Sequence, residues 1–206
     1  MKYPNFEEEK LLKYQGFKCV VGLDEAGRGP LAGPVVAAAV HVSNFDILIS
    51  NLKIRDSKQL SEKQREEIYE IITKHSNFQW GIGIVSEKVI DKINIFEATK
   101  LAMKKAIKDL NPDYLLLDGN FALDINLPQK SVVKGDQKVV SISAASIIAK
   151  VTRDRIMKKY DKKYPQYGFS KHKGYGTELH VKMLKEFKEC PIHRKSFSPV
   201  VKVLSK

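Results

Sequence analysis

The sequence predicts an α/β fold in which a mixed β-sheet is flanked by helices. Short apolar runs bounded by Gly, Pro or Asp alternate with segments of helical periodicity, in the order strand, strand, helix, strand, helix, strand, strand, helix. The length of 206 residues and the apolar content of 43% fit one domain with a sizeable core. We expect a single domain over residues 1–206, with a core over about 18–160 and a basic C-terminal helical segment over about 161–206.

The strands are predicted from apolar runs. Residues 20–24 form a run that leads into two adjacent carboxylates, Asp24 and Glu25, and residues 35–42 form a second run. The Gly- and Pro-rich loop between them is short, which favours an antiparallel pair. Residues 114–117 are apolar on both faces, as is typical of a central parallel strand. The remaining expected strands cover residues 80–85 and 132–133.

The helices are predicted from periodicity and capping residues. Residues 61–74 begin with Ser61 as the N-cap, and Gln64 three positions later completes a capping box. Residues 95–110 carry apolar side chains at helical spacing and end at an Asn-Pro-Asp tripeptide. The other expected helices cover residues 6–14, 140–162 and 177–188.

The positive charge is concentrated in the C-terminal part. The formal net charge is +12, of which residues 1–149 contribute +1 and residues 150–206 contribute +11. A solvated lysine-rich helical face would give this composition, and so would a surface that binds a polyanion. The acidic motifs described below favour the polyanion.

Composition also argues against several other classes. No apolar run approaches the roughly 18 residues of a membrane span, and the acidic N-terminus is unlike a signal peptide, so we expect a cytoplasmic protein without a membrane segment. Cys19 is expected to pack in a strand. Cys190 and His193 form a Cys-x-x-His pattern, but a structural zinc site needs a second pair, so zinc is not expected and the role of these two residues stays open.

Residues 22–36 carry the most informative motif. Asp24 and Glu25 stand at the end of the first apolar run, and Arg28 follows between two glycines. Carboxylates, accessible backbone amides and a guanidinium within six residues suit a metal-dependent site for a phosphodiester. The run is not a phosphate-binding P-loop, because it lacks the terminal Gly-Lys-Ser/Thr. Asp118 and Asp136 also lie after expected strands, where each alone would fit a turn or cap.

This run closely resembles the signature of type 2 ribonuclease H, the bacterial ribonuclease HII family. Further blocks that resemble the family follow in its order: Asp56-Ser57-Lys58-Gln59-Leu60-Ser61, residues 94–103, Leu117-Asp118-Gly119, Lys134-Gly135-Asp136, residues 144–154 and residues 172–177. Each block alone is weak, but together they are specific and span about residues 18–200. The resemblance implies a ribonuclease H-like core and an endoribonuclease.

The resemblance also implies a chemistry. The expected enzyme hydrolyses RNA in RNA/DNA hybrids, incises duplex DNA at embedded ribonucleotides, and leaves 3′-hydroxyl and 5′-phosphate ends. The expected cofactor is Mg²⁺ or Mn²⁺, with two ions when substrate is bound. The family's catalytic metal ligands correspond here to Asp24, Glu25, Asp118 and Asp136.

Substrate contacts are implied in the same way. Gly27, Arg28 and Gly29 resemble the family's ribose-sensing loop, although a plain tight turn would read the same in sequence. Tyr175 resembles the aromatic residue that packs on the sugar, the alternative being core packing. Lys58 resembles a phosphate contact, the alternative being a surface lysine.

Other interpretations remain open at this stage. His172 and His180 are expected to bind backbone or to be structural, in preference to a metal or general-base role. A non-catalytic duplex-binding module would explain the basic segment but not the four carboxylates. A resolvase-like nuclease on the same core would act on DNA junctions as a dimer, whereas we expect a monomer.

Overall fold

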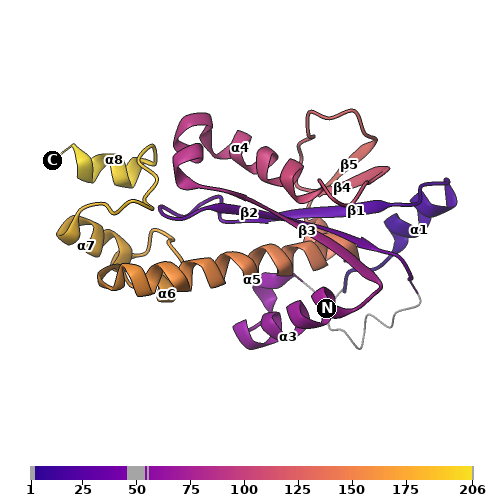
Figure 1. The fold of residues 1–206 in the computed structure, drawn as a ribbon, viewed down its shortest axis with the longest axis horizontal. Coiled ribbons are helices and arrows are strands. Elements are labelled where there is room, and N and C mark those ends of the chain that lie inside the picture. Colours follow the sequence, from indigo (N-terminus) through magenta and orange to yellow (C-terminus); the bar gives the residue numbers. More distant parts are fainter. Residues whose placement is uncertain (1–2, 46–53, 55, 206) are drawn as a thin grey trace.

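The computed structural model describes residues 3–45, 54 and 56–205, and a five-stranded mixed sheet forms its centre (Figure 1). The strand order is β3-β2-β1-β4-β5. β1 pairs with β2 antiparallel and with β4 parallel, so β1 is the middle strand. The strands are β1 (Val20–Ala26), β2 (Val35–Val42), β3 (Phe78–Val85), β4 (Tyr114–Asp118) and β5 (Gln129–Val132).

Helices cover both faces of this sheet. α4 (Glu87–Ala106) lies on one face, and α5 (Val140–Lys163) and α3 (Glu62–Lys74) lie on the other (Figure 1). One buried cluster, which includes Val21, Leu23 and Met103, fills the α4 side. A second cluster on the α5 side includes Val40 and Ile148. The predicted mixed sheet flanked by helices is confirmed.

α5 packs unusually close to β1, and a glycine makes this possible. A Cβ added to Gly22 would lie 2.4 Å from the backbone carbonyl carbon of Ser141. Such a contact is far inside van der Waals distance, so a larger residue would push the helix away from the strand. Gly22 therefore faces α5, and Asp24, two residues later on the same strand, shares that face because side chains alternate.

Most predicted elements are present with shifted ends. Ser61 and Gln64 form both hydrogen bonds of the predicted capping box at the start of α3. The helix expected to begin at residue 95 begins instead at Glu87. Asn94 interrupts it with φ 64° and ψ 168°, and its side chain accepts hydrogen bonds from the amides of Phe96 and Glu97. Asn94 thus acts as an internal N-cap, and the pattern after it resembled a helix start for that reason.

Other boundaries also differ from prediction: β1 ends at Ala26 where residue 24 was expected, and β3 begins at Phe78 where residue 80 was expected. The strand expected at residues 132–133 is β5, which begins at Gln129 and ends at Val132. The helix expected to reach residue 110 ends at Ala106 and continues as turns.

The C-terminal part extends away from the sheet beyond the end of α5 (Figure 1). It contains α6 (Phe169–His172), α7 (Glu178–Phe187) and α8 (Ser198–Leu204), and α1 (Glu7–Tyr14) lies at the opposite end of the molecule. Short 3-10 turns are η1 (Ser57–Gln59), η2 (Gly135–Gln137) and η3 (Pro165–Tyr167). Among the described residues, no helix combines the length and apolarity needed to cross a membrane.

Candidate active site

Strand register brings Asp24 and Asp118 together. The parallel pairing of β1 and β4 places Leu23 beside Leu117, and each aspartate is the next residue on its strand. Both side chains therefore leave the sheet on the same face at neighbouring positions. The two residues lie 94 positions apart in the chain, so this juxtaposition is a product of the fold.

Asp136 joins them from the 3-10 turn η2. The amide of Gly135 donates to Oδ1 of Asp118 at 2.7 Å, which holds the turn against the end of β4. One carboxylate oxygen from each of Asp24, Asp118 and Asp136 can be chosen so that all three lie within 4.8 Å of one another. Oxygen ligands at this spacing are those that a hard divalent cation prefers, so the three side chains fit a Mg²⁺ or Mn²⁺ ion.

The electrostatics of the cluster favour a bound cation. Burial raises the pKa of Asp24 well above its usual 3.8, and the nearby Glu25 and Asp118 charges raise it further. Burial likewise raises the pKa of Asp136, with a further contribution from Asp118 and Asp56. Mutual repulsion of buried carboxylates is costly, and a divalent cation between them would relieve it.

Glu25 lies at the rim of this group. Alternation along β1 sends its side chain to the face opposite to that of Asp24, and it is not one of the three clustered carboxylates. Its Oε1 pairs instead with Nη1 of Arg28 at 3.5 Å. Burial raises the pKa of Glu25, Arg28 opposes this, and the charge of Asp118 adds to it, so Glu25 remains electrostatically part of the site.

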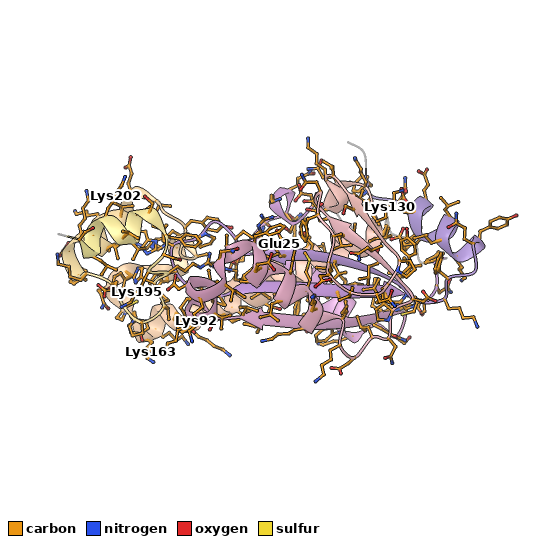
Figure 2. All side chains as sticks on the ribbon, turned by 90° about the horizontal axis from the view of Figure 1, so that it is seen from above. Glu25, Lys92, Lys130, Lys163, Lys195 and Lys202 are labelled. Atoms are coloured by element: carbon orange, nitrogen blue, oxygen red, sulfur yellow. The ribbon has the colours of Figure 1, made fainter. Side chains whose placement is uncertain are left out.

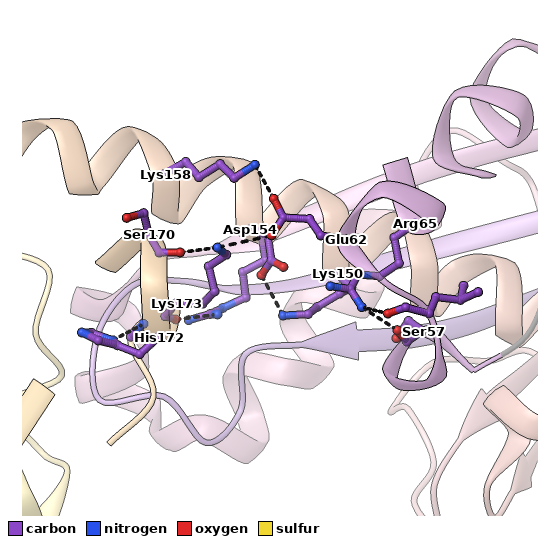
Figure 3. A network of polar contacts seen from close by, with 12 residues as sticks. Ser57, Glu62, Arg65, Lys150, Asp154, Lys158, Ser170, His172 and Lys173 are labelled. Carbon is purple, nitrogen blue, oxygen red and sulfur yellow. Dashed lines mark hydrogen bonds and ion pairs between the residues drawn. The ribbon is translucent and has the colours of Figure 1, made fainter. Parts of the chain in front are cut away.

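Lys58 approaches the cluster from the turn η1. Its Nζ lies 3.4 Å from Oδ2 of Asp136, while the side chain is 80% exposed. The turn is held by Asp56, whose Oδ1 accepts from the Lys58 amide and whose Oδ2 accepts from Nε2 of Gln137. Arg65 donates from Nη1 to the Ser57 carbonyl and supports the turn from α3 (Figure 3). An exposed ammonium beside a carboxylate cluster can contact a phosphate there.

Tyr175 lies beside the glycine loop. A Cβ on Gly29 would lie 3.9 Å from Cε1 of the Tyr175 ring, and the ring is 43% exposed. The Leu31 amide donates to the Gly174 carbonyl at 2.8 Å, which joins the two segments. Gly29 and Tyr175 therefore line one surface, with the ring open to solvent and not buried in the core.

Two buried arginines that sequence reasoning missed support this loop. Arg194 is fully buried and donates to the carbonyls of Gly27, Arg28 and Gly33 at 2.6, 2.9 and 2.9 Å. Arg153 is 1% exposed and donates to the carbonyls of Ala32, Pro34 and Lys173.

These contacts fix the direction in which the loop carbonyls point. Because six carbonyls of residues 27–34 and 173 point toward buried guanidinium groups, their partial negative charges are turned inward. Burial lowers the pKa of both Arg153 and Arg194. No sequence signal marked these two arginines, because Arg153 stands beside Asp154 and Arg194 stands between His193 and Lys195, as surface arginines often do.

Polar pairs on the α5 side extend from the site toward the C-terminal segment. Lys150 Nζ donates to Asp154 Oδ1 at 2.8 Å, and Glu62 pairs with both Lys158 and Lys173 (Figure 3). Farther along, Lys163, Lys195 and Lys202 lie at the same end of the molecule, beyond Glu25 (Figure 2). The basic segment thus lies to one side of the carboxylates.

Comparisons with known proteins agree with this geometry. Residues 21–200 match the family model described as Ribonuclease HII. The chain is 56% identical over 192 residues to Ribonuclease HII of Acetivibrio thermocellus, covering 92% of this chain and 73% of that protein. It is 52% identical over 194 residues to Ribonuclease HII of Bacillus subtilis, covering 93% and 74%.

Solved structures show the same fold. The ribonuclease H2 of Pyrococcus horikoshii OT3 superposes with a TM-score of 0.74 at 27% identity, covering 91% of this chain and 97% of that one. The structure of the PCNA:RNase HII complex from Archaeoglobus fulgidus gives a TM-score of 0.75 at 29% identity, covering 87% and 95%.

Proposed function

The chain belongs to the ribonuclease HII family, metal-dependent nucleases that act on RNA/DNA hybrids, and from this premise we propose that it also incises duplex DNA at single embedded ribonucleotides. The observation that carries the proposal is the convergence of three carboxylates, two of them buried and Asp118 partly buried, beside an exposed Tyr175 and the loop that contains Gly29. The first group can hold divalent ions, and the second can contact a sugar.

The proposed metal ligands are Asp24, Glu25, Asp118 and Asp136. Two bound divalent ions would activate a water molecule and stabilise the leaving oxygen, which gives 3′-hydroxyl and 5′-phosphate ends. The clustered aspartates would hold the ions, and hydrogen bonds such as that from the Gly135 amide to Asp118 fix the orientation of the ligand carboxylates. Glu25, the next residue along β1, would be the fourth ligand; here it pairs with Arg28.

Selection of RNA is proposed to depend on the glycine loop and Tyr175. The 2′-hydroxyl distinguishes RNA from DNA at one position, and it can both donate and accept. Gly27, Arg28 and Gly29 would offer backbone groups to it, and Gly29 has no Cβ in the way. The carbonyls of Gly27 and Arg28 are already bound by Arg194, which leaves the amide nitrogens of these residues. Tyr175 would stack on the adjacent sugar. Neither contact reads a base, so little sequence preference is expected.

Duplex positioning is assigned to the basic C-terminal segment and to Lys58. The lysines of residues 150–206 supply a net charge of +11, which suits a phosphate backbone. Lys58 would contact a phosphate near the reacting position while its ammonium partly balances Asp136.

The test is cleavage of a duplex bearing one ribonucleotide, compared with an RNA/DNA hybrid and an all-DNA duplex, in Mg²⁺ and in Mn²⁺. Asp118→Asn keeps the Oδ1 acceptor for Gly135 but removes the charge, so we expect cleavage to fall at least about 100-fold with binding retained. Asp124→Asn, the same change at an exposed loop residue, is the control.

Each alternative outcome is informative. Binding of duplexes without metal-dependent cleavage would support a binding module, and cleavage of all-DNA junctions would support a resolvase-like nuclease. Near-native turnover by Asp118→Asn would refute the proposed ligand set.

A further inference from the structure

Three histidines of the C-terminal segment are buried away from the carboxylates. His180 and His193 are 0% and 1% exposed, and His172 is 8% exposed. The rings of His172 and His180 stack with centroids 4.4 Å apart, and Phe169 packs edge-on against both. Such groups are costly to bury unless every ring nitrogen has a partner.

The partners of His193 determine where its proton lies. Its Nδ1 lies 2.9 Å from the Cys190 amide nitrogen and 3.3 Å from the Cys190 carbonyl oxygen. The amide contact is the shorter one, and an amide nitrogen can only donate, so Nδ1 is the acceptor. A neutral His193 therefore carries its proton on Nε2. That atom lies 3.0 Å from Nε2 of His180.

The partners of His180 show where its proton lies. Its Nδ1 lies 2.9 Å from the carbonyl oxygen of Tyr175, which can only accept. His180 therefore carries its proton on Nδ1 and accepts on Nε2 from His193. The two assignments agree, and together they form one chain of hydrogen bonds from the Cys190 amide through His193 and His180 to the Tyr175 carbonyl.

The chain requires both rings to be neutral. A second proton on His180 would place two N–H groups against each other at 3.0 Å. Burial lowers the pKa of His180 and of His193 to about 4, which keeps both rings neutral near pH 7. The ring nitrogens are also occupied by these bonds, so they are not free to bind a metal ion.

The chain ends at the residue proposed to stack on the ribose. The Tyr175 carbonyl also accepts from the Thr177 amide at 2.9 Å, and the Tyr175 amide donates to the His172 carbonyl at 2.9 Å. His172 Nδ1 accepts from the Gly174 amide at 3.2 Å. The backbone on both sides of Tyr175 is therefore held by histidines, while its ring stays open to solvent.

We infer that His193 and His180 are positioning residues that act as a neutral, directional hydrogen-bond chain to hold Tyr175 against the Gly29 surface. This inference rests on the proposed contact between Tyr175 and the sugar. It assigns the two histidines no proton transfer to substrate, because both are buried.

Nitrogen NMR tests the chain directly on the full-length protein labelled with ¹⁵N-histidine at pH 7. We expect two buried histidines with the proton on Nε2, His193 and His172, and one with the proton on Nδ1, His180, each assigned by single substitution. His193 and His180 are the two positions that test the chain. A cationic ring, or the same tautomer at both positions, would overturn the chain.

A matched pair of variants separates positioning from stability. In His180→Asn the amide nitrogen takes the place of Nδ1 and still donates to Tyr175, but the link to His193 is lost. In His180→Gln the amide lies near the former Nε2, so the link to His193 is kept and the donor to Tyr175 is lost. We expect His180→Asn to keep kcat/KM within about threefold and His180→Gln to lose about 10- to 100-fold, because a displaced substrate contact costs on that scale.

The stability of the two variants should rank in the opposite order. His180→Gln keeps a partner for the buried His193 donor and should have the higher melting temperature. If activity followed stability, the histidines would be structural, and the inference would fail. His75→Gln, at an exposed histidine, controls for loss of a ring as such.

A double-mutant comparison tests whether the activity difference between His180→Asn and His180→Gln depends on the Tyr175 ring. In a Tyr175→Ala background, the Asn and Gln variants should cleave equally well, because the positioned group is gone. A persistent difference would show that the histidines act through another group and would overturn the inference. If Tyr175→Ala cleaved as fast as the parent enzyme, both the proposed ribose contact and the positioning role would be refuted. If NMR showed other tautomers for His193 and His180, only the hydrogen-bond chain would be refuted.

Discussion

Replacing Arg194 by lysine tests whether a buried guanidinium holds the Gly-Arg-Gly loop in place. The side chain is 0% exposed, and its Nε, Nη1 and Nη2 donate to the carbonyls of Gly33, Arg28 and Gly27. The lysine variant keeps the positive charge and most of the aliphatic stem. It loses the planar arrangement of donors that reaches three separate carbonyls.

The magnitude follows from counting those bonds. A lysine ammonium at this position can reach one of the three carbonyls, so two hydrogen bonds from a charged donor are lost. Each such bond contributes about 1.5–3 kcal/mol, so the expected loss is about 3–6 kcal/mol. Solvent screening does not reduce this figure because Arg194 is buried. The loss is a large part of the 5–15 kcal/mol that is typical of a whole domain.

Urea unfolding gives the free energy of unfolding by linear extrapolation. Arg155→Lys is the matched control, because Arg155 is 40% exposed and pairs with Glu66 and Glu70 on the surface. Exposed ion pairs contribute about 0–1 kcal/mol, so this variant should stay within about 1 kcal/mol of the parent protein.

Activity provides the second measurement on the folded fraction. Because the loop proposed to contact ribose loses its support, Arg194→Lys should cleave more slowly even where it is fully folded. A variant that loses less than about 1 kcal/mol and keeps full activity would refute the assigned role of Arg194.

Three further predictions concern the metal, the pH and the packing. Mg²⁺ at 100 times its Kd should stabilise the protein by about 2.7 kcal/mol, and Asp118→Asn should abolish most of this gain in a thermal melt. Because the pKa values of His180 and His193 are lowered to about 4 from 6.5, the unfolded chain binds more protons between these limits. Stability should therefore fall as pH drops from about 6.5 to 4, by up to about 1.4 kcal/mol per pH unit for each ring, measured by urea unfolding. Gly22→Ala should cost about 1–3 kcal/mol or more in the same assay, because its Cβ would meet the Ser141 backbone at 2.4 Å.

Contrary outcomes are clear for each of these. A melting temperature that does not respond to Mg²⁺ or Mn²⁺ would count against the carboxylate cluster. The free energy of unfolding is measured against pH for the parent protein and for His180→Asn, and the two curves are subtracted. The subtraction removes the effect of Asp24, whose raised pKa changes the stability in the opposite direction above pH 3.8. An unchanged slope in the variant would show that the histidine is not the titrating group. A Gly22→Ala protein as stable as its parent would mean that α5 can move outward freely.

Local signals predicted most of the fold. The Ser61–Gln64 capping box marked the start of α3 because its two hydrogen bonds are made between residues three apart. Alternation and continuous apolar character marked the strands. The early start of α4 was missed because Asn94 caps the second half of the helix so well that the pattern resembled a true beginning.

Contacts between distant segments were harder to predict. Arg194 binds carbonyls 161 to 167 positions away, and a carbonyl acceptor leaves no trace in the residue type that carries it. The histidine chain was equally hidden, since its partners are the backbone of Cys190 and Tyr175. The expectation that His172 and His180 bind backbone is confirmed, but the sequence did not show that His180 would contact Tyr175.

The motif that contains Asp24 and Glu25 did not predict the spatial partners of these two carboxylates. Their proximity in the chain suggested one shared pocket, yet alternation along β1 gives them opposite faces. The partner of Asp24 is chosen by register, because Leu23 pairs with Leu117 and thereby brings Asp118 alongside. Glu25 pairs with Arg28 of the glycine loop, and the charge of Asp118 still raises its pKa. The two carboxylates therefore differ in their surroundings: Asp24 belongs to the cluster with Asp118 and Asp136, whereas Glu25 pairs with Arg28.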